Sequence, residues 1–354
     1  MIRFVWRWIK RLVLLVIVLV LLLLAPVGYN ELACTSEPQD DGYGAIVIDK
    51  TWHRAESRSY MTYPEWHIVH AYDDYAAVIR TGDPHEFGYF SATRGFWRSL
   101  CALTEVSAQH GGFDWETKQT IYTIGVSFTL ELALKAAYEE TVGRIATLLR
   151  GTTRAPLDDL SAIQATKYAA FLQQVPWYRW DFDSDIEGLE AASSGSIRDR
   201  ERRIALGIEF GVKSAYAEVI ANAVAGIGAD QLRLRMVVTG LDRATLDALD
   251  GVDVIFEARG GYIIETPRYR ALTHLLADMA SAGGNFIEIA GNDDIMLTAI
   301  APKGAEHGAL FAFDRQGYGD TRHLISMKVT ELAGWLRAAA DPANGLTLEH
   351  IHDY

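Results

Sequence analysis

Residues 232–266 read LRLRMVVTGLDRATLDALDGVDVIFEARGGYIIET, and this stretch decides the fold class of the second half of the chain. Over residues 232–238, leucine, methionine and valine recur at every second position, which is the period of a half-buried strand. Asp242 is suited to capping a short helix. Two further apolar runs, at residues 252–258 and 262–266, flank a pair of glycines that is typical of a hairpin turn.

Outward from this stretch, the strand pattern continues toward the C-terminus. A helix is expected to begin at Pro267 and to end at Gly283 and Gly284. Two more strands are expected at residues 286–290 and 295–301. The order β-α-β-β-α-β, with one added strand, predicts a ferredoxin-like (split βαβ) module.

The residues before this module have helical patterns. Residues 198–225 are expected to form one long helix, since apolar residues recur at spacings of three and four. The segment 183–197 is rich in serine, glycine and acidic residues, as linkers are. Residues 59–182 are helical in pattern and rich in aromatic residues. The sequence therefore predicts an α+β protein with a mostly α-helical, aromatic-rich layer before the ferredoxin-like module.

The N-terminus carries a membrane signal. Residues 12–25 read LVLLVIVLVLLLLA, and with the residues up to Gly28 the run reaches the lower limit of about 17 residues for crossing a bilayer. Basic residues precede the run and acidic residues follow it, so the positive-inside rule places the N-terminus in the cytoplasm. We expect a single-pass protein of a bacterial inner (plasma) membrane, with its body in the periplasm.

A cleaved signal peptide and a lipoprotein are the alternatives to an uncleaved anchor. Cleavage after Ala25 would place Pro26 next to the cut, and Glu31 is unsuited to the position three residues before a lipid-bearing Cys34. The uncleaved anchor is therefore favoured. The predicted organisation is a cytoplasmic basic tail at 1–11, a transmembrane anchor at 12–28, a juxtamembrane stalk at 29–58, a helical domain at 59–182, a linker at 183–197, and a long helix with the ferredoxin-like domain at 198–354.

Composition excludes some classes of protein. The chain has 354 residues, of which 49% are hydrophobic, and its formal net charge is −13. That hydrophobic content excludes a disordered chain. A body this acidic repels phosphate backbones, so we expect no nucleic-acid partner. The sequence has no P-loop, dinucleotide-binding glycine motif, GxSxG, CxxC or HExxH motif.

The two cysteines, Cys34 and Cys101, leave two interpretations open. In an oxidising periplasm they can form a disulfide. Alternatively, Cys101 lies between apolar neighbours and is a buried free thiol. The separation of the two Cα atoms decides between these interpretations.

The candidate site begins in the run YPEWHIVHAYDDY at residues 63–75. On a helix, His67, His70 and Asp74 share one face at spacings of three and four. Two imidazoles and a carboxylate there are suited to holding a divalent metal ion or to acid–base catalysis. The structural alternative is that these histidines form hydrogen bonds with tyrosines and backbone in a seam between helices.

Histidines are also enriched at the C-terminus, where His350 and His352 point the same way if the tail is a strand. A site shared with His67 and His70 requires the tail to return to the first helix of the body. The alternative is an exposed polar end, as most tails are.

Glu131 is a weaker catalytic candidate. Residues 121–134 form an apolar run that is short for a membrane span and contains Glu131, so a buried helix is expected there. Glu131, Lys135 and Glu139 are spaced by four residues, which is typical of a row of salt bridges on a helix. Burial of Glu131 would favour a functional role instead.

Two stretches carry a resemblance to a known family. MTYPEWHIVH at residues 61–70 and SFTLELALKAAYEETVGR at residues 127–144 resemble signatures of an uncharacterised family of bacterial membrane-anchored proteins with a TYPEWHIV-type motif. The resemblance covers about residues 1–180. It implies a membrane anchor and no assigned activity, so it implies no catalytic residue.

Three functions fit these features. The favoured one is a partner-binding scaffold or envelope assembly factor, which contacts the lipid bilayer through residues 12–28 and another envelope protein through its body. The second is a membrane-tethered metal-dependent enzyme centred on His67, His70 and Asp74. The third is a lipid- or glycan-binding module, because tyrosine and tryptophan offer flat amphipathic faces.

Overall fold

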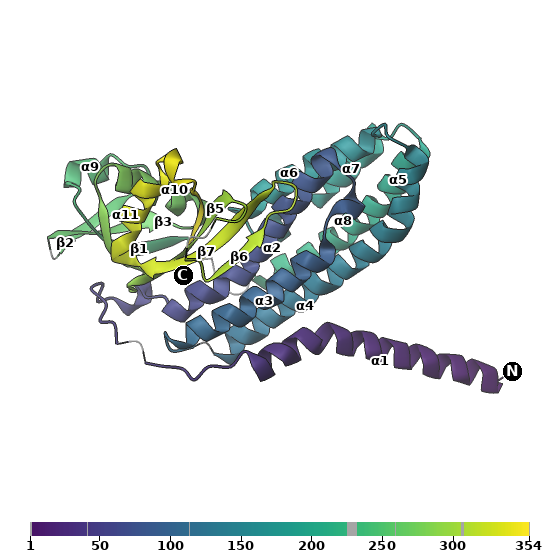
Figure 1. Cartoon of the computed structure of the whole chain (residues 1–354), viewed down its shortest axis with the longest axis horizontal. Coiled ribbons are helices and arrows are strands. Elements are labelled where there is room, and N and C mark those ends of the chain that lie inside the picture. The colour runs from purple at the N-terminus through teal and green to yellow at the C-terminus, as the bar shows by residue number, and fades with distance from the viewer. Residues whose placement is uncertain are drawn as a thin grey trace.

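The computed structural model describes residues 2–40, 42–112, 114–224, 232–258, 260–305 and 308–353. The chain is a mixed α+β protein. It is mostly helical, with an apolar N-terminal helix and antiparallel sheets in its C-terminal part (Figure 1). The long helix expected at 198–225 forms as far as Val224, and residue 225 lies outside the described residues.

All regular elements of the described chain as far as Val224 are helical, and we call α2–α8 the helical arm. Gly125 lets two of these helices approach closely, since a Cβ at this position would collide with the ring of Phe96. The helices are α1 (Ile2–Ala33), α2 (Glu56–Thr81), α3 (Tyr89–Ala108), α4 (Trp115–Tyr138), the π-helical turn η3 (Glu139–Gly143), α5 (Arg144–Arg150), α6 (Pro156–Leu172), α7 (Phe182–Ala192) and α8 (Ile197–Val224).

The C-terminal part contains two four-stranded sheets, and every strand pairing in them is antiparallel. The first sheet has the order β2-β3-β1-β4, from β1 (Arg233–Thr239), β2 (Asp253–Ala258), β3 (Gly261–Pro267) and β4 (Asn285–Ile289). The second has the order β6-β7-β5-β8, from β5 (Asp294–Pro302), β6 (Phe311–Asp314), β7 (Asp320–Lys328) and β8 (Thr347–His352). Three helices accompany them: α9 (Arg243–Asp247), α10 (Tyr269–Ser281) and α11 (Val329–Ala339).

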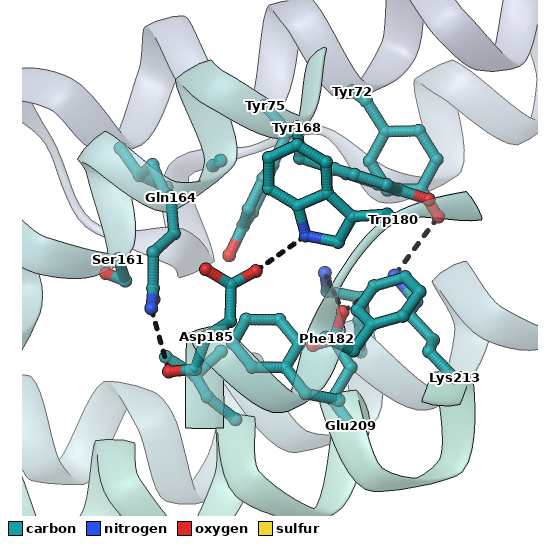
Figure 2. A pocket seen from close by; sticks show the side chains of 15 residues that line it. Tyr72, Tyr75, Ser161, Gln164, Tyr168, Trp180, Phe182, Asp185, Glu209 and Lys213 are labelled. Carbon is teal, nitrogen blue, oxygen red and sulfur yellow. Dashed lines mark hydrogen bonds and ion pairs between the residues drawn. The ribbon is translucent and has the colours of Figure 1, made fainter. Parts of the chain in front are cut away.

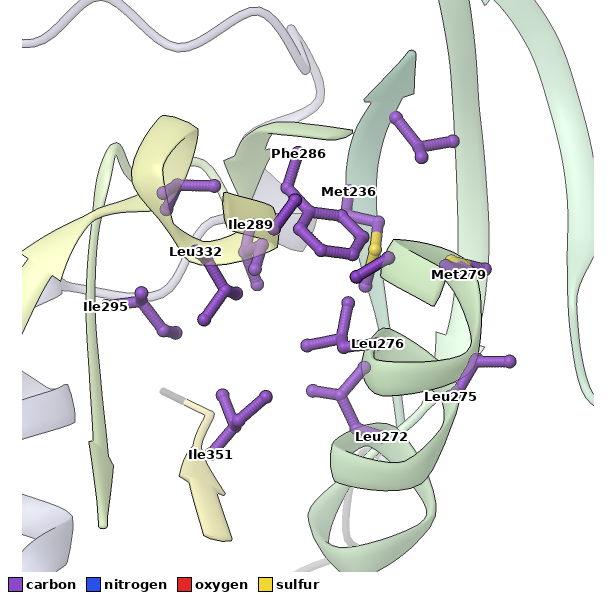
Figure 3. Close-up of a cluster of buried hydrophobic side chains, with 14 of the residues drawn as sticks. Met236, Leu272, Leu275, Leu276, Met279, Phe286, Ile289, Ile295, Leu332 and Ile351 are labelled. Atoms are coloured by element: carbon purple, nitrogen blue, oxygen red, sulfur yellow. The ribbon is translucent and has the colours of Figure 1, made fainter. Parts of the chain in front are cut away.

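This arrangement corrects the expectation of one module with one added strand. The strand expected at 295–301 forms as β5, but it lies at the centre of a second sheet, between β7 and β8. Its partners come from the tail, where the sequence gives weaker signals. One hydrophobic core serves both sheets, because α10 and α11 supply apolar residues between them. Figure 3 shows Leu272 and Leu276 of α10 directed toward Phe286 of β4, with Leu332 of α11 and Ile351 of β8 nearby.

The expected linker at 183–197 is largely helical. Asp181 caps α7 by accepting a hydrogen bond from the Ser184 backbone N–H at 3.0 Å. Leu189 is fully buried and packs against residues of α6 and α8. The serine and acidic content reflects the exposed face of a short amphipathic helix, so the helical arm continues through this segment.

The expected stalk at 29–58 also differs from a free tether. Helix α1 continues to Ala33, and its last turn packs on α3 and α4. Further along, the carboxylate of Glu288 in β4 accepts hydrogen bonds from the backbone N–H groups of Ile46 and Val47. This segment therefore lies against the first sheet.

Candidate functional site

A disulfide joins the end of α1 to the body. Cys34, directly after α1, is bonded to Cys101 of α3, with their Cα atoms 5.1 Å apart. In the same place, Glu31 accepts hydrogen bonds from Lys118 at 2.8 Å and Tyr122 at 2.5 Å. Of the two interpretations of the cysteines, the structure has the disulfide. In the part of the chain that is described, α1 is the one helix long and apolar enough to cross a membrane.

The predicted residues of α2 are all buried. His67 Nε2 donates to the backbone carbonyl of Ala92 at 2.8 Å, and His67 is 4% exposed. His70 Nδ1 lies 3.7 Å from a carboxylate oxygen of Glu349. Asp74 accepts a hydrogen bond from the Gln316 backbone N–H at 3.0 Å. These three side chains therefore have different partners.

The C-terminal strand β8 returns to α2 and brings His350 and His352 to the same place. The His350 ring stacks on Trp66 with ring centroids 3.6 Å apart, and the His352 ring lies edge-on to Tyr63 at 5.4 Å. The tail is thus a buried strand and not an exposed end. We call this contact, formed by His67, His70, His350 and His352 with Tyr63 and Trp66, the histidine seam.

Charged groups lie within the histidine seam. Arg322 of β7 is fully buried and donates to both carboxylate oxygens of Glu349, at 2.5 and 2.6 Å. Arg322 Nη1 also lies 3.9 Å from Asp74 Oδ1. Several ring nitrogens of the seam have no hydrogen-bond partner among the described residues, including both nitrogens of His352.

Burial sets the protonation of the seam. Removal from water lowers the pKa of His67 to about 4, and it lowers the pKa values of His70, His350 and His352 well below the usual range. Burial also raises the pKa of Asp74 to about 7, although Arg322 opposes this change. The four imidazoles are therefore neutral at pH 7.

The metal site predicted at His67, His70 and Asp74 does not have converging ligand atoms. Among the described residues, the single His, Cys, Asp and Glu group whose ligand atoms all lie within 4.8 Å of one another is Glu56, His110 and Asp294. Asp294 there already accepts from Lys328 at 2.6 Å, and its backbone N–H donates to Glu56. This second group is accordingly an ion-pair cluster. The seam provides packing and buried neutral imidazoles, closed to solvent.

A pocket lies elsewhere in the helical arm, between α2, α4, α6, α7 and α8. It has about 480 Å³ of space between atoms, open solvent included, of which about 40 Å³ can hold the centres of water molecules. Figure 2 shows Trp180 donating to Asp185 and Lys213 donating to Tyr72 across this space. Six of its fifteen lining residues are aromatic: Tyr72, Tyr75, Tyr168, Trp180, Phe182 and Phe210.

Glu131, a weak candidate from sequence, belongs to a charge network at this pocket. Its carboxylate accepts from Tyr72 at 2.7 Å and pairs with Lys213 at 2.9 Å. Glu209 lies 3.0 Å from both Lys213 and Lys135. Burial alone would raise the pKa of Glu209, but the two lysines outweigh it and lower that pKa. Two cations and two anions therefore neutralise one another beside the aromatic wall.

Sequence reasoning missed most of this pocket. The expected salt-bridge row Glu131–Lys135–Glu139 does not form along α4, because each member pairs with α8 instead. The available signal was the pair Glu209 and Lys213, one turn apart on α8 opposite that row. In comparisons with known proteins, no family model, curated protein or solved structure matches this chain.

Proposed function

We propose that this chain is a single-pass protein of a bacterial inner membrane, with its N-terminus in the cytoplasm and its body in the periplasm. Three features support this proposal. Helix α1 is exposed along its apolar length, the basic residues precede that length, and the disulfide after α1 is typical of an oxidising compartment. The family resemblance of residues 1–180 also fits an anchored protein.

The oxidation state of Cys34 and Cys101 tests this location. In intact cells, both sulfurs of the full chain should resist alkylation until a reductant is added. The Cys34→Ser variant should expose one thiol and lose roughly 2–4 kcal/mol of stability, since the unfolded chain is no longer cross-linked. Two thiols that react in untreated cells would place the body in the cytoplasm and contradict the proposal.

We further propose that the body binds a small ligand with an apolar part, such as a lipid acyl chain, in the pocket of the helical arm. The observation that carries this proposal is the wall of aromatic rings beside a neutral charge network. A lining of aromatic and apolar side chains with a few polar groups is typical of sites that bind small ligands. The Oε1 atom of Gln164, which lines the pocket, has no partner among the described residues and can accept a hydrogen bond.

This proposal favours binding over catalysis. A metal-dependent enzyme at His67, His70 and Asp74 gains no support from the geometry, because those side chains are buried and have separate partners. Substrate has no path to a group that is 4% exposed within a packed seam.

Dibromostearate tests the pocket, because bromine quenches tryptophan fluorescence on contact and Trp180 is in the wall. In the full chain in lipid nanodiscs, quenching should contain a saturable component. Trp180→Phe removes the reporter and Ala165→Phe fills the pocket, so each should abolish that component. Ala170→Phe, on the exposed side of the same helix, should preserve it.

The tryptophans of α1 give a background that is the same in every variant. Saturable quenching that survives Ala165→Phe would mean that the fatty acid binds elsewhere, and the pocket would then be part of the packing of the helical arm.

A second candidate is the partner-binding scaffold predicted from sequence, and one observation favours it. Strand β2 is at an edge of the first sheet, and it exposes Ile255 and Phe256. An exposed apolar edge strand is suited to receiving a strand of another protein. We infer that β1–β4 with α9 and α10 are the ferredoxin-like unit that presents this edge, since their order β2-β3-β1-β4 fits two interleaved βαβ units.

A further inference from the structure

The outward side of α4 has no exposed charge over most of its length. Between Ile121 and Tyr138, the exposed residues are threonine, serine, alanine and leucine, and Leu134 is 64% exposed. The charged residues in this interval, Glu131 and Lys135, are turned inward and paired with α8. This uncharged face extends for about 27 Å along the helix.

Helix α8 has a matching face. Ile204, Ile208 and Val212 are 60–65% exposed, although their spacing of four residues is that of a buried stripe. Between Ile204 and Ala217, no charged side chain is exposed. Single exposed apolar residues are ordinary, whereas a continuous stripe of this kind marks an interaction surface.

The two faces belong to neighbouring helices. Lys135 pairs with Glu209, and Tyr138 donates to Glu201 at 2.6 Å, so α4 and α8 run side by side. Because these contacts use the inner sides of both helices, the outer sides remain uncovered together. We call the outer side of Ile121–Tyr138 and Ile204–Ala217 the apolar band.

The apolar band begins where the anchor helix joins the body. Val27 of α1 packs beside Tyr122 and Val126 of α4, and Glu31 is bonded to Lys118. From this junction α1 and α4 extend toward the same end of the molecule (Figure 1). From this junction the two helices diverge, so the apolar band lies beside the anchor segment only near Val27.

Charge returns at both ends of the apolar band. Glu116 is exposed before it on α4, and Glu140 and Arg144 are exposed after it. Inside the arm, the lysines and glutamates neutralise one another, as groups close to lipid must.

We propose that the helical arm is seated on the periplasmic face of the membrane beside the end of α1, with the apolar band of α4 and α8 against the acyl chains of that leaflet. The occupant is the bilayer and not a second protein, because the band is continuous with the anchor and carries no exposed charge. The inference rests on the proposed anchoring by α1. It places the aromatic pocket close to the lipids that we propose as its ligands.

Photoreactive lipid tests the seating. The full chain is reconstituted in phosphatidylethanolamine–phosphatidylglycerol liposomes that contain a diazirine-bearing phosphatidylcholine, and the adducts are mapped by mass spectrometry. We expect adducts on residues 12–25, on the α4 peptide with Leu134, and on the α8 peptide with Ile208. Strand β2 is the matched control, because Phe256 is 50% exposed and apolar but lies in the first sheet.

Adducts on α1 with no more on α4 and α8 than on β2 would overturn the inference and leave the anchor intact. Absence of adducts on α1 would overturn the anchoring itself, and the seating with it. The double variant Ile208→Gln/Val212→Gln should lose α8 adducts several-fold while keeping the disulfide and the helical content. Ile255→Gln should leave the labelling unchanged. Unchanged α8 labelling in the double variant would also overturn the inference.

Discussion

Lowering the pH from 7 toward 5 should remove several kcal/mol of stability, and the histidine seam is the reason. The pKa of His67 is lowered to about 4, and those of His70, His350 and His352 are also lowered. In the unfolded chain these groups titrate near 6.5. Below that pH the unfolded state binds four protons that the folded state does not bind. The stability present above pH 6.5 is therefore lost as the pH falls toward 4.

Asp74 acts in the opposite direction. Its pKa is raised to about 7, so the folded state takes up one proton that an unfolded aspartate binds only near pH 4. Counted over these four histidines and Asp74 alone, the net difference is three protons in favour of the unfolded state. At about 1.4 kcal/mol per proton and pH unit, stability should fall by roughly 4 kcal/mol for each unit below about pH 6.

Chemical denaturation at several pH values, followed by tryptophan fluorescence, measures this slope. His352→Phe is the matched variant, because both nitrogens of His352 lack a partner and the residue is fully buried. Its loss removes one titrating group, so the slope should decrease by about 1.4 kcal/mol per pH unit. The same slope in wild type and variant would show that His352 does not remain neutral in the folded state.

Arg322→Met should destabilise the chain by about 3–5 kcal/mol, because it leaves Glu349 buried without its cation. Arg322 donates two hydrogen bonds to Glu349 and is fully buried. Asp74, 3.9 Å away, loses its nearest cationic neighbour as well. Equilibrium unfolding of the full chain at pH 7.5 measures the loss.

Two further variants separate the effect of the buried charge from the effect of packing. In Arg322→Met/Glu349→Gln the uncompensated charge is gone, so much of the lost stability should return. Arg243→Met removes an exposed pair with Asp247 and should cost less than 1 kcal/mol. If the single and double variants at Arg322 lose the same amount, the packing of the arginine matters and its charge does not.

Local patterns in the sequence predicted the elements themselves. The apolar run at 12–25, the alternation over 232–238 and the glycine pair after 258 each depend on neighbours within a few residues, and α1, β1 and the β2–β3 pairing follow from them. The helical character of residues 59–182 is equally local. Segment 183–197 has the composition of a polar linker, but most of it belongs to α7, because a short helix with one buried leucine has a similar composition.

Only the tertiary structure decided which elements meet. The disulfide between Cys34 and Cys101, the second sheet around β5 and the joining of His67 and His70 to His350 and His352 all depend on contacts between distant segments. Likewise, the aromatic pocket takes its wall from five helices. Helical and strand periods show which face of an element is apolar, but they do not show what covers that face. On α8, the stripe at Ile204, Ile208 and Val212 has the spacing of a core face, yet it points outward, because the paired charges on the opposite side of the helix are satisfied only inside the arm.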